Sequence, residues 1–334
     1  MIWLAEATVL SLRDLEGIGP VAEKKLVDAG IESVLELAVA LPDEVSQILN
    51  IDKVKAYELI YSAQVALMDS GYLDKSLVNA FDVLEKRRGM MKCTTGSKSL
   101  DSLLKGGIET QAITEFWGEY GTGKTQICHT LCVTCQLPRE KGGLNGSALY
   151  IDTESTFRPE RLHQIAEARG VDPAQALKNT YICRVYNSSH LEFVIKNVGK
   201  YIEKYNIRLM IVDSVISLYR GEFLGRENLA ERQQRLNRLL HRLLRVAEIY
   251  NVAVVVTNQV QSQPDIFFGD PNKPSGGNIM AHACTYRIHL KKVGQDRKAV
   301  IVDSPYHPYS EAVFSISDKG VVDVEEKRGR QVEV

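Results

Sequence analysis

A glycine-rich segment that follows an apolar run and precedes a helix-forming run carries the clearest chemistry in this sequence. Residues 118–125 read GEYGTGKT, a full match to the G-x-x-x-x-G-K-[ST] phosphate-binding pattern. Glycines there let backbone N–H groups curl around phosphate oxygens, while Lys124 can reach the terminal phosphates and Thr125 can hold Mg²⁺. The segment therefore predicts a nucleotide site made of Gly118, Glu119, Tyr120, Gly121, Thr122, Gly123, Lys124 and Thr125.

Acidic residues end two further apolar runs, as a magnesium–nucleotide site requires. Residues 209–212 lead into Asp213, whose carboxylate can organise the magnesium ion beside the phosphate loop. Residues 148–151 lead into Asp152 and Glu154, and hydrolysis needs a base or a water-orienting group. We assign that role to Glu154 rather than Asp152, and the alternative is an ordinary strand-end acid in a solvated loop.

Two amides and a polar segment follow the apolar run at residues 252–257. Gln259 can sense a γ-phosphate through a hydrogen bond or simply cap the strand end, and its spacing favours neither role. Residues 260–278 are polar and rich in glycine and proline, which predicts a long loop. Its apolar residues Ile266, Phe267 and Phe268 suit stacking on nucleic-acid bases, unless the loop folds back onto the core.

Arginines between residues 219 and 245 form a second candidate for phosphate contact. Arg220 and Arg226 lie in a predicted glycine-containing loop, and we assign both to nucleic-acid phosphate. The helix that follows has a leucine stripe on one face, which predicts core, and an arc of arginines beside it that includes Arg232. Such an arc is more often a solvated or subunit-facing surface than a DNA contact.

From residue 94 onward, apolar β-branched runs alternate with helical stretches, and these elements must position the candidate site. Runs that are apolar throughout, with helices between them, predict a mostly parallel sheet covered on both faces, an α/β fold. The predicted strands are residues 112–117, 148–152, 181–185, 209–213, 252–258, 286–291 and 299–302.

Residues 1–70 read instead as short helices separated by Gly, Pro and Asp. Gly17 and Gly19 fit the tight turn of a helix-hairpin-helix, which can present backbone N–H groups to a phosphate. A packing or protein-docking role is the alternative, because residues 1–75 carry 6 basic and 13 acidic side chains, a net charge of −7. Residues 71–93 read as a linker with a basic end, so we predict domains at 1–70 and 94–334.

Composition places the chain among ordinary globular proteins. Hydrophobic residues make up 44% and charged residues 25%, which excludes a disordered, collagen-like or disulfide-scaffold chain. The apolar runs are too short to span a bilayer and the first residues lack a secretory signal, so we expect a soluble intracellular protein with no membrane partner. Cys128, Cys132 and Cys135 share helical spacing among apolar neighbours, which predicts buried thiols.

Together these motifs resemble the RadA-type recombinases of archaea and their eukaryotic counterparts, relatives of the bacterial RecA proteins. The matching segments are the hairpin near Gly17 and residues 94–97, 118–126, 150–162, 219–233, 257–260, 276–278 and 303–308. The resemblance implies a RecA-like ATPase core that forms filaments on single-stranded DNA, pairs them with homologous double-stranded DNA and exchanges strands in repair. The alternatives are an accessory paralogue that loads or remodels such filaments, and a hexameric helicase-like motor.

The resemblance also implies roles for individual residues. It makes Lys124 and Thr125 ligands of ATP phosphate and Mg²⁺, Asp213 the acid behind the magnesium ion, Glu154 the water activator and Gln259 the γ-phosphate sensor. To the nucleotide site it adds Gln126, Arg158 and Arg161, and it makes Asp303 and Pro308 a cap on the ATP of a neighbouring protomer, with K⁺ allowed nearby. The implied DNA-binding residues are Arg220, Arg226, Arg232, Phe267, Phe268, Gly276, Gly277 and Asn278.

One segment departs from the family's pattern. The family's linker usually carries Phe-x-x-Ala, whose Phe inserts into the adjacent subunit, whereas the aligned residues here run from Leu77 to Ala80. Leucine fills less volume, so a pocket that has not adapted would weaken this subunit contact by on the order of a few kcal/mol. The resemblance places the protein in the cytoplasm or nucleoid, or in a eukaryotic nucleus, with mediator proteins as further partners.

Overall fold

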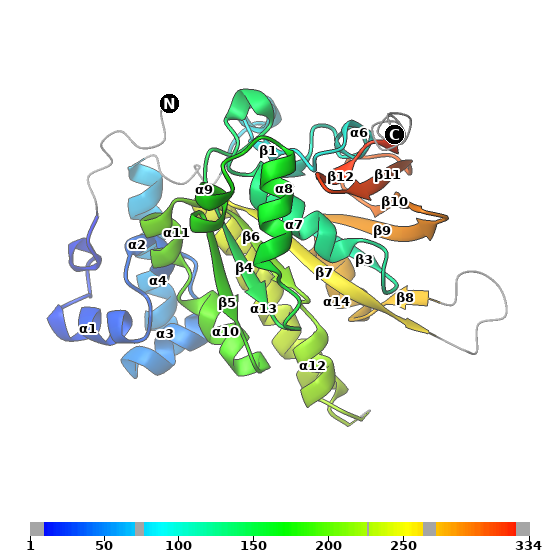
Figure 1. Ribbon diagram of the computed structural model, residues 1–334. Coiled ribbons are helices and arrows are strands. Elements are labelled where there is room, and N and C mark those ends of the chain that lie inside the picture. Colours follow the sequence, from blue (N-terminus) through cyan, green and yellow to red (C-terminus); the bar gives the residue numbers. More distant parts are fainter. Residues whose placement is uncertain (1–9, 71–76, 226, 263–271, 325–334) are drawn as a thin grey trace. The chain divides into compact units, whose positions relative to one another are not determined.

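The computed structural model describes residues 10–70, 77–225, 227–262 and 272–324 (Figure 1). The chain divides into two compact units, Met1–Gly89 and Met90–Val334. Among the residues described, no helix is both long and apolar enough to cross a membrane.

The first unit is helical, as its sequence predicts. Local caps set the helix boundaries: Ser33 and Glu36 form a reciprocal capping box, and the Asp52 carboxylate accepts a hydrogen bond from the Lys55 amide. Its elements are η1 (Leu12–Asp14), α1 (Pro20–Asp28), α2 (Val34–Ala38), α3 (Pro42–Leu49), α4 (Lys53–Asp69) and α5 (Ala80–Arg88). The predicted linker therefore contains a helix, α5, capped by Asn79 and without a buried residue.

The two glycines of the hairpin, Gly17 and Gly19, differ in backbone conformation and in the space around them. Gly17 has φ +89°, and a Cβ there would lie 3.0 Å from the Leu59 side chain, so the turn itself requires glycine. Gly19 is the N-cap of α1 with extended backbone, and nothing lies within 4 Å of its Cβ position. The backbone at Gly19 is therefore open on that side.

The second unit holds the predicted α/β core. Its helices are α6 (Lys98–Leu103), α7 (Lys124–Thr134), η2 (Arg139–Lys141), α8 (Pro159–Ala168), α9 (Pro173–Lys178), α10 (Ser188–Lys196), α11 (Gly199–Tyr205), α12 (Ser217–Glu222), α13 (Leu229–Tyr250) and α14 (Gly277–Ala283). Its strands are β1 (Lys92–Cys93), β2 (Ile108–Glu109), β3 (Ala112–Gly118), β4 (Ser147–Asp152), β5 (Thr180–Arg184), β6 (Ile207–Asp213), β7 (Ala253–Ser262), β8 (Asn272–Pro274), β9 (Tyr286–Val293), β10 (Asp296–Asp303), β11 (Glu311–Ser317) and β12 (Gly320–Val322).

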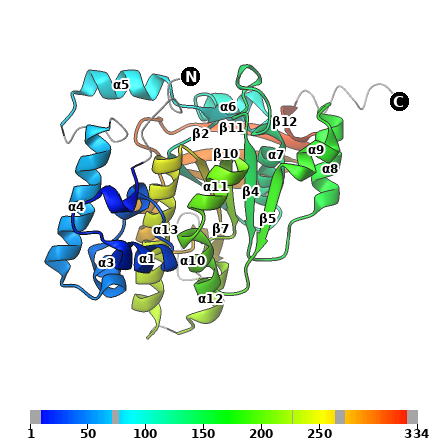
Figure 2. The ribbon, with the colours of Figure 1, turned by 90° about the vertical axis from the view of Figure 1, so that its left-hand side faces the viewer.

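The main sheet has the strand order β12-β11-β10-β9-β3-β7-β6-β4-β5. The pairs from β9 to β5 are parallel, while β9, β10, β11 and β12 pair antiparallel. Helices α7, α8 and α9 lie on one face and α10, α11 and α13 on the other (Figure 2). Each predicted strand is present, and the central strands β3, β4 and β6 are buried on both faces of the sheet.

Side chains that alternate along the strands fill the hydrophobic layers on both faces of the sheet. In β6, Leu209 and Ile211 enter the cluster under α7 and α8, while Met210 and Val212 enter the cluster under α10 and α13. This is why the strands read as apolar throughout rather than alternating. The cysteines of α7 are buried free thiols, as their spacing predicts.

Further sequence-based expectations differ from the structure. Both described ends of the predicted loop at 260–278 are regular structure, because β7 runs through Ser262, residues 272–274 pair back against it as β8, and α14 begins at Gly277. Arg220 lies in helix α12 rather than in a loop. Strands β11 and β12 were not predicted, because β11 mixes exposed and buried positions without regular alternation and β12 is very short.

Candidate functional site

The predicted phosphate loop joins the end of β3 to the start of α7. Gly123, with φ +101°, is the N-cap of α7, and a Cβ there would lie 2.9 Å from the Ile316 side chain. The Lys124 ammonium donates to the carbonyls of Gly118 and Glu119, both at 2.9 Å, so it folds over the loop. Burial lowers the pKa of Lys124, while the nearby carboxylates of Asp213 and Glu154 oppose that shift.

Asp213 lies at the end of β6, buried next to the first turn of α7. The hydroxyls of Thr125 and Tyr150 donate to its Oδ2 at 2.9 and 2.5 Å, and the hydroxyl of Thr257 donates to Oδ1. Burial, reinforced by the charge of Asp213, raises the pKa of Tyr150, so this phenol stays protonated as a donor. Oxygen groups of this kind suit Mg²⁺, with Thr125 and Asp213 in contact as their predicted roles require.

Glu154 and Gln259 meet across the strand ends. The Gln259 amide donates to Glu154 Oε1 at 2.7 Å. Register explains the meeting, because Gln259 pairs with Gly118 across β7 and β3, and Asp152 pairs with Asp213 across β4 and β6. Burial, and then repulsion from Asp213, raise the pKa of Glu154, which suits a general base better than an ordinary carboxylate would.

Asp152, the rejected candidate for the base, has a structural role. Its carboxylate accepts hydrogen bonds from the backbone amides of Glu154, Thr156 and Phe157 at 3.1–3.2 Å. The carboxylate is buried and fixes the turn that projects Glu154. The two acids thus have different surroundings: Asp152 holds the turn, and Glu154 contacts Gln259. The role of Glu154 as the base stays a prediction.

His129 belongs to this site, although the sequence reasoning missed it. Its Nδ1 lies 2.8 Å from the carbonyl of Thr125, and its Nε2 accepts from the backbone N–H of Arg158 at 3.1 Å. Its ring stacks on Phe157 at 5.0 Å. Burial lowers the pKa of His129, so the ring is neutral and links the phosphate loop to α8. Its i, i+4 spacing from Thr125 was the available signal.

The other predicted nucleotide residues divide into two places. Arg161 donates through Nε to the Gln126 side chain at 2.8 Å and through Nη2 to the Ser317 carbonyl at 2.6 Å, so it ties α7 to the turn between β11 and β12. Arg158 donates to the carbonyls of Ser155 and Phe157, beside His129. These residues lie near the phosphate loop, unlike the predicted cap.

The predicted cap residues Asp303 and Pro308 lie away from the end of β3 that carries the phosphate loop. Glu115 pairs with Arg287 across β3 and β9, and Arg287 pairs with Asp303 across β9 and β10. Glu115 lies three positions before Gly118, so the strand position that pairs with Asp303 is about 10 Å back along β3 from the phosphate loop. Residues 304–308 then follow the end of β10. The register therefore does not place Asp303 beside the phosphate loop of the same chain.

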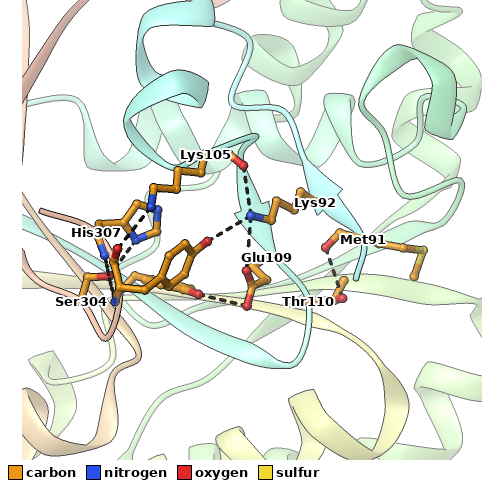
Figure 3. A network of polar contacts seen from close by, with 9 residues as sticks. Met91, Lys92, Lys105, Glu109, Thr110, Ser304 and His307 are labelled. Atoms are coloured by element: carbon orange, nitrogen blue, oxygen red, sulfur yellow. Dashed lines mark hydrogen bonds and ion pairs between the residues drawn. The ribbon is translucent and has the colours of Figure 1, made fainter. Parts of the chain in front are cut away.

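A polar network fastens the cap segment to β1 and β2 (Figure 3). The Lys92 ammonium donates to the Lys105 carbonyl at 3.0 Å and to the Tyr306 hydroxyl at 3.2 Å, and pairs with buried Glu109 at 3.4 Å. The ring of His307 packs against Tyr306 in a tilted arrangement, with ring centroids 4.1 Å apart, and its Nδ1 lies 2.7 Å from the Ser304 hydroxyl. Residues 304–307 are thus tied to β1 through Lys92 and contact one another through His307.

The predicted DNA-binding residues are only partly brought together. Arg220 donates to the Ser275 hydroxyl at 3.3 Å, which places it next to Gly276 and Gly277 at the start of α14. Asn278 lies in the first turn of α14, and Arg232 lies in the first turn of α13. Arg226, Phe267 and Phe268 lie outside the described residues. In the predicted arginine arc, Arg235 pairs with Glu192 of α10 at 2.9 Å.

A glycine-rich phosphate loop and carboxylates at the ends of parallel strands, in a sheet between two helical layers, define a P-loop nucleotide-binding protein. Residues 86–324 match the family model for Rad51, and residues 9–64 match a SAM-like helix-hairpin-helix tandem. The chain is also 49% identical over 316 residues to a DNA repair and recombination protein RadA of Cenarchaeum symbiosum (strain A), which covers 94% of this chain and 79% of that relative. The chain belongs to the Rad51 family.

These comparisons confirm the resemblance and the predicted fold. The Rad51 match spans the α/β core, and the tandem match confirms the helix-hairpin-helix predicted around Gly17. Proteins of this family bind ATP with Mg²⁺, in keeping with the phosphate loop.

Proposed function

We propose that this protein is an ATP-dependent DNA strand-exchange recombinase that assembles as a filament on single-stranded DNA and pairs it with homologous double-stranded DNA in repair. The observation that carries the proposal is the complete set of nucleotide groups at one end of the sheet. Lys124, Thr125, Asp213, Glu154 and Gln259 are all present and four of them are linked by two direct hydrogen bonds, from Thr125 to Asp213 and from Gln259 to Glu154.

The residues support a specific division of labour in ATP hydrolysis. Thr125 would hold Mg²⁺, with Asp213 behind it, and the bound ion would neutralise charge that develops on the phosphates. Lys124 would exchange its two carbonyl partners for phosphate oxygens. Glu154 would orient a water and accept its proton, for which a raised pKa is suited. Gln259 is placed to sense the γ-phosphate because it already contacts Glu154.

The register of the sheet supports an ATP site shared between protomers. Asp303 lies about 10 Å from the row of the phosphate loop along the strands, so a cap made by residues 303–308 needs the ATP of another copy. The Lys92 and Tyr306 network would then hold that cap against the neighbour's nucleotide. Self-assembly is therefore part of the proposed mechanism. The proposal also allows a K⁺ ion to bind near the cap.

DNA contact is proposed at the residues around Ser275. Arg220 donates to Ser275, and its charge also acts on Glu154, where it partly opposes the rise in pKa that burial and Asp213 cause. Arg220 therefore lies between Glu154 and the Gly276 turn. Arg232, Gly277 and Asn278 extend this region at the starts of two helices. Cationic side chains and helix N-termini at one place suit a phosphate backbone.

An accessory paralogue is the second candidate, and the linker is the observation that favours it. Leu77 is 92% exposed where the family has a Phe anchor, although Phe81 of α5 is also 67% exposed. A weak anchor would give a protein that binds DNA and ATP but assembles poorly. Changing Leu77 to Phe should then strengthen assembly, which sedimentation of the protein with ATP would measure.

Joint-molecule formation tests the proposal directly. A labelled single strand and a homologous supercoiled duplex are incubated with the protein, ATP and Mg²⁺, beside a nonhomologous duplex and the Lys124→Ala variant. We expect product that depends on homology and is lost with Lys124→Ala. Product that persists in this variant contradicts the assigned site, and ATP-dependent strand binding without any product favours the accessory role.

A further inference from the structure

Glu115 is a carboxylate buried in the middle of β3, away from the nucleotide groups. The residue is 0% exposed. A buried charge is costly unless it is paired and fully hydrogen-bonded, so its presence in a central strand calls for a partner on each oxygen. Arg287 of β9 donates through Nε to Oε2 at 2.6 Å, and Asn258 of β7 donates through Nδ2 to Oε1 at 2.7 Å.

Asn258 extends this contact to the chain just before α14. The same Nδ2 group donates to the Ser275 carbonyl at 2.7 Å, and the Ser275 amide donates to the Gln259 carbonyl at 2.9 Å. The backbone of Ser275 is therefore held on both its polar groups by two consecutive residues of β7. Figure 1 shows β8 and α14 at this end of β7.

The two β7 residues face opposite sides of the sheet, as successive strand residues must. Gln259 contacts Glu154 among the nucleotide groups, whereas Asn258 contacts Glu115 on the side of α14. Ser275 receives contacts from both residues, and Gly276, with φ +89°, follows at once. At the end of β7, the Gln259 side chain therefore contacts the predicted nucleotide groups, and the Asn258 side chain contacts the residue before the Gly276 turn.

Resting on the recombinase function proposed above, we propose that Glu115 is a positioning residue that links the nucleotide site to the DNA-binding residues 276–278. It orients the Asn258 amide, which fixes Ser275 so that displacement of Gln259 by a γ-phosphate moves the start of α14. Arg287 supplies the counter-charge that lets Glu115 remain buried. The Glu115 side chain touches neither ATP nor DNA.

The orientation of Asn258 fits this assignment. Its Oδ1 is buried without a hydrogen-bond partner among the described residues. The flipped amide would set that oxygen against the Glu115 carboxylate and the Ser275 carbonyl, two acceptors that give it nothing to bond. One unsatisfied oxygen is the smaller cost, so the carboxylate selects the amide orientation that holds Ser275.

A matched pair of double variants tests whether the acceptor at position 115 matters. Glu115→Gln with Arg287→Met removes the ion pair but keeps an oxygen that accepts from Asn258. Glu115→Leu with Arg287→Met removes the ion pair and the acceptor at nearly the same volume. The readout is the affinity for a fluorescein-labelled poly-dT oligonucleotide, measured with a non-hydrolysable ATP analogue and with ADP, and the ratio of the two affinities expresses the coupling.

We expect the Gln–Met variant to keep the affinity ratio of the unmodified protein. The Leu–Met variant and Asn258→Ala should lower the ratio at least about tenfold while binding a fluorescent ATP analogue normally. Equal ratios in the two double variants would overturn the proposal, as would loss of ATP-analogue binding along with the ratio. Circular dichroism establishes that each variant is folded. If the unmodified protein shows no nucleotide-dependent DNA binding, the recombinase proposal itself fails, which is a distinct result.

Discussion

Two buried carboxylates flank β7 and have opposite surroundings. Asp213 of β6 is held by hydroxyls, including that of Thr257 in β7, and forms no ion pair within the described residues. Glu115 of β3 is held by the guanidinium of Arg287 and by Asn258, the next residue of β7. One strand therefore serves a carboxylate on each of its sides.

The difference indicates what each carboxylate is for. Hydroxyl donors satisfy the lone pairs of Asp213 but leave its charge for a cation that comes and goes, such as the magnesium ion of a nucleotide. Glu115 has a permanent cation, so nothing further is needed to balance its charge. The surroundings of Asp213 therefore suit exchange with a ligand, whereas those of Glu115 suit a fixed geometry.

The first prediction concerns Glu115→Gln alone. Removing one partner of a buried ion pair leaves Arg287 without its counter-charge, so we expect a loss of about 3–5 kcal/mol in the free energy of unfolding. Urea unfolding followed by circular dichroism measures this loss. Adding Arg287→Met should restore most of the stability. A single variant as stable as the unmodified protein contradicts the ion pair described here.

Asp213→Asn should give the opposite result. The amide keeps the shape of the side chain but loses the charge behind the magnesium ion, so turnover of ATP should fall by about 100-fold. The free energy of unfolding should change by less than about 1 kcal/mol, because Asp213 forms no ion pair within the described residues and the amide can still hydrogen-bond to its hydroxyl neighbours. Phosphate release at saturating ATP and DNA, with urea unfolding of the same sample, measures both. A loss of stability as large as that of Glu115→Gln would contradict the proposed difference between the two carboxylates.

The sequence predicts the Asp213 side far better than the Glu115 side. Lys124, Asp213, Glu154 and Gln259 follow apolar runs or a glycine-rich loop, and the carboxyl ends of parallel strands meet at one edge of the sheet. Glu115 lies inside an apolar run and looks like a lone charge. Its partners are 143 and 172 residues away in the sequence, and only the register of β3, β7 and β9 brings them together.

Other residues escaped prediction for local physical reasons. His129 reads as an ordinary helix position, because its role depends on the Arg158 amide that folds back onto it. Arg220 was assigned to a loop because Gly221 follows it, yet the two lie in α12. Strands β11 and β12 close the antiparallel end of the sheet with few buried side chains, so their sequence pattern is weak.

A third prediction concerns the pH dependence of ATP turnover, which depends on Glu154 on the nucleotide side of β7. Burial and the charge of Asp213 raise the pKa of Glu154, and a base works only when deprotonated. Turnover should therefore fall as the pH drops through that raised pKa, at a higher pH than an ordinary glutamate would allow. Steady-state turnover from pH 5 to 8 measures this, with Glu154→Gln as control. An unchanged acidic decline in the Glu154→Gln variant would mean that another group titrates.

The smallest predicted effect is a difference in unfolding free energy between variants of two buried threonines, which face the same side of the sheet in β3 and β7. Thr257 donates to Asp213, whereas the Thr114 hydroxyl is buried without a hydrogen-bond partner among the described residues. Valine has the same shape as threonine, so Thr257→Val removes only the bond to a carboxylate and should cost about 1–2 kcal/mol of unfolding free energy. Thr114→Val removes a hydroxyl that bonds to nothing and should leave stability unchanged or raise it by up to about 1 kcal/mol. Urea unfolding compares the two. If both variants lost the same unfolding free energy, the hydrogen bond from Thr257 to Asp213 would add nothing beyond the packing of the side chain.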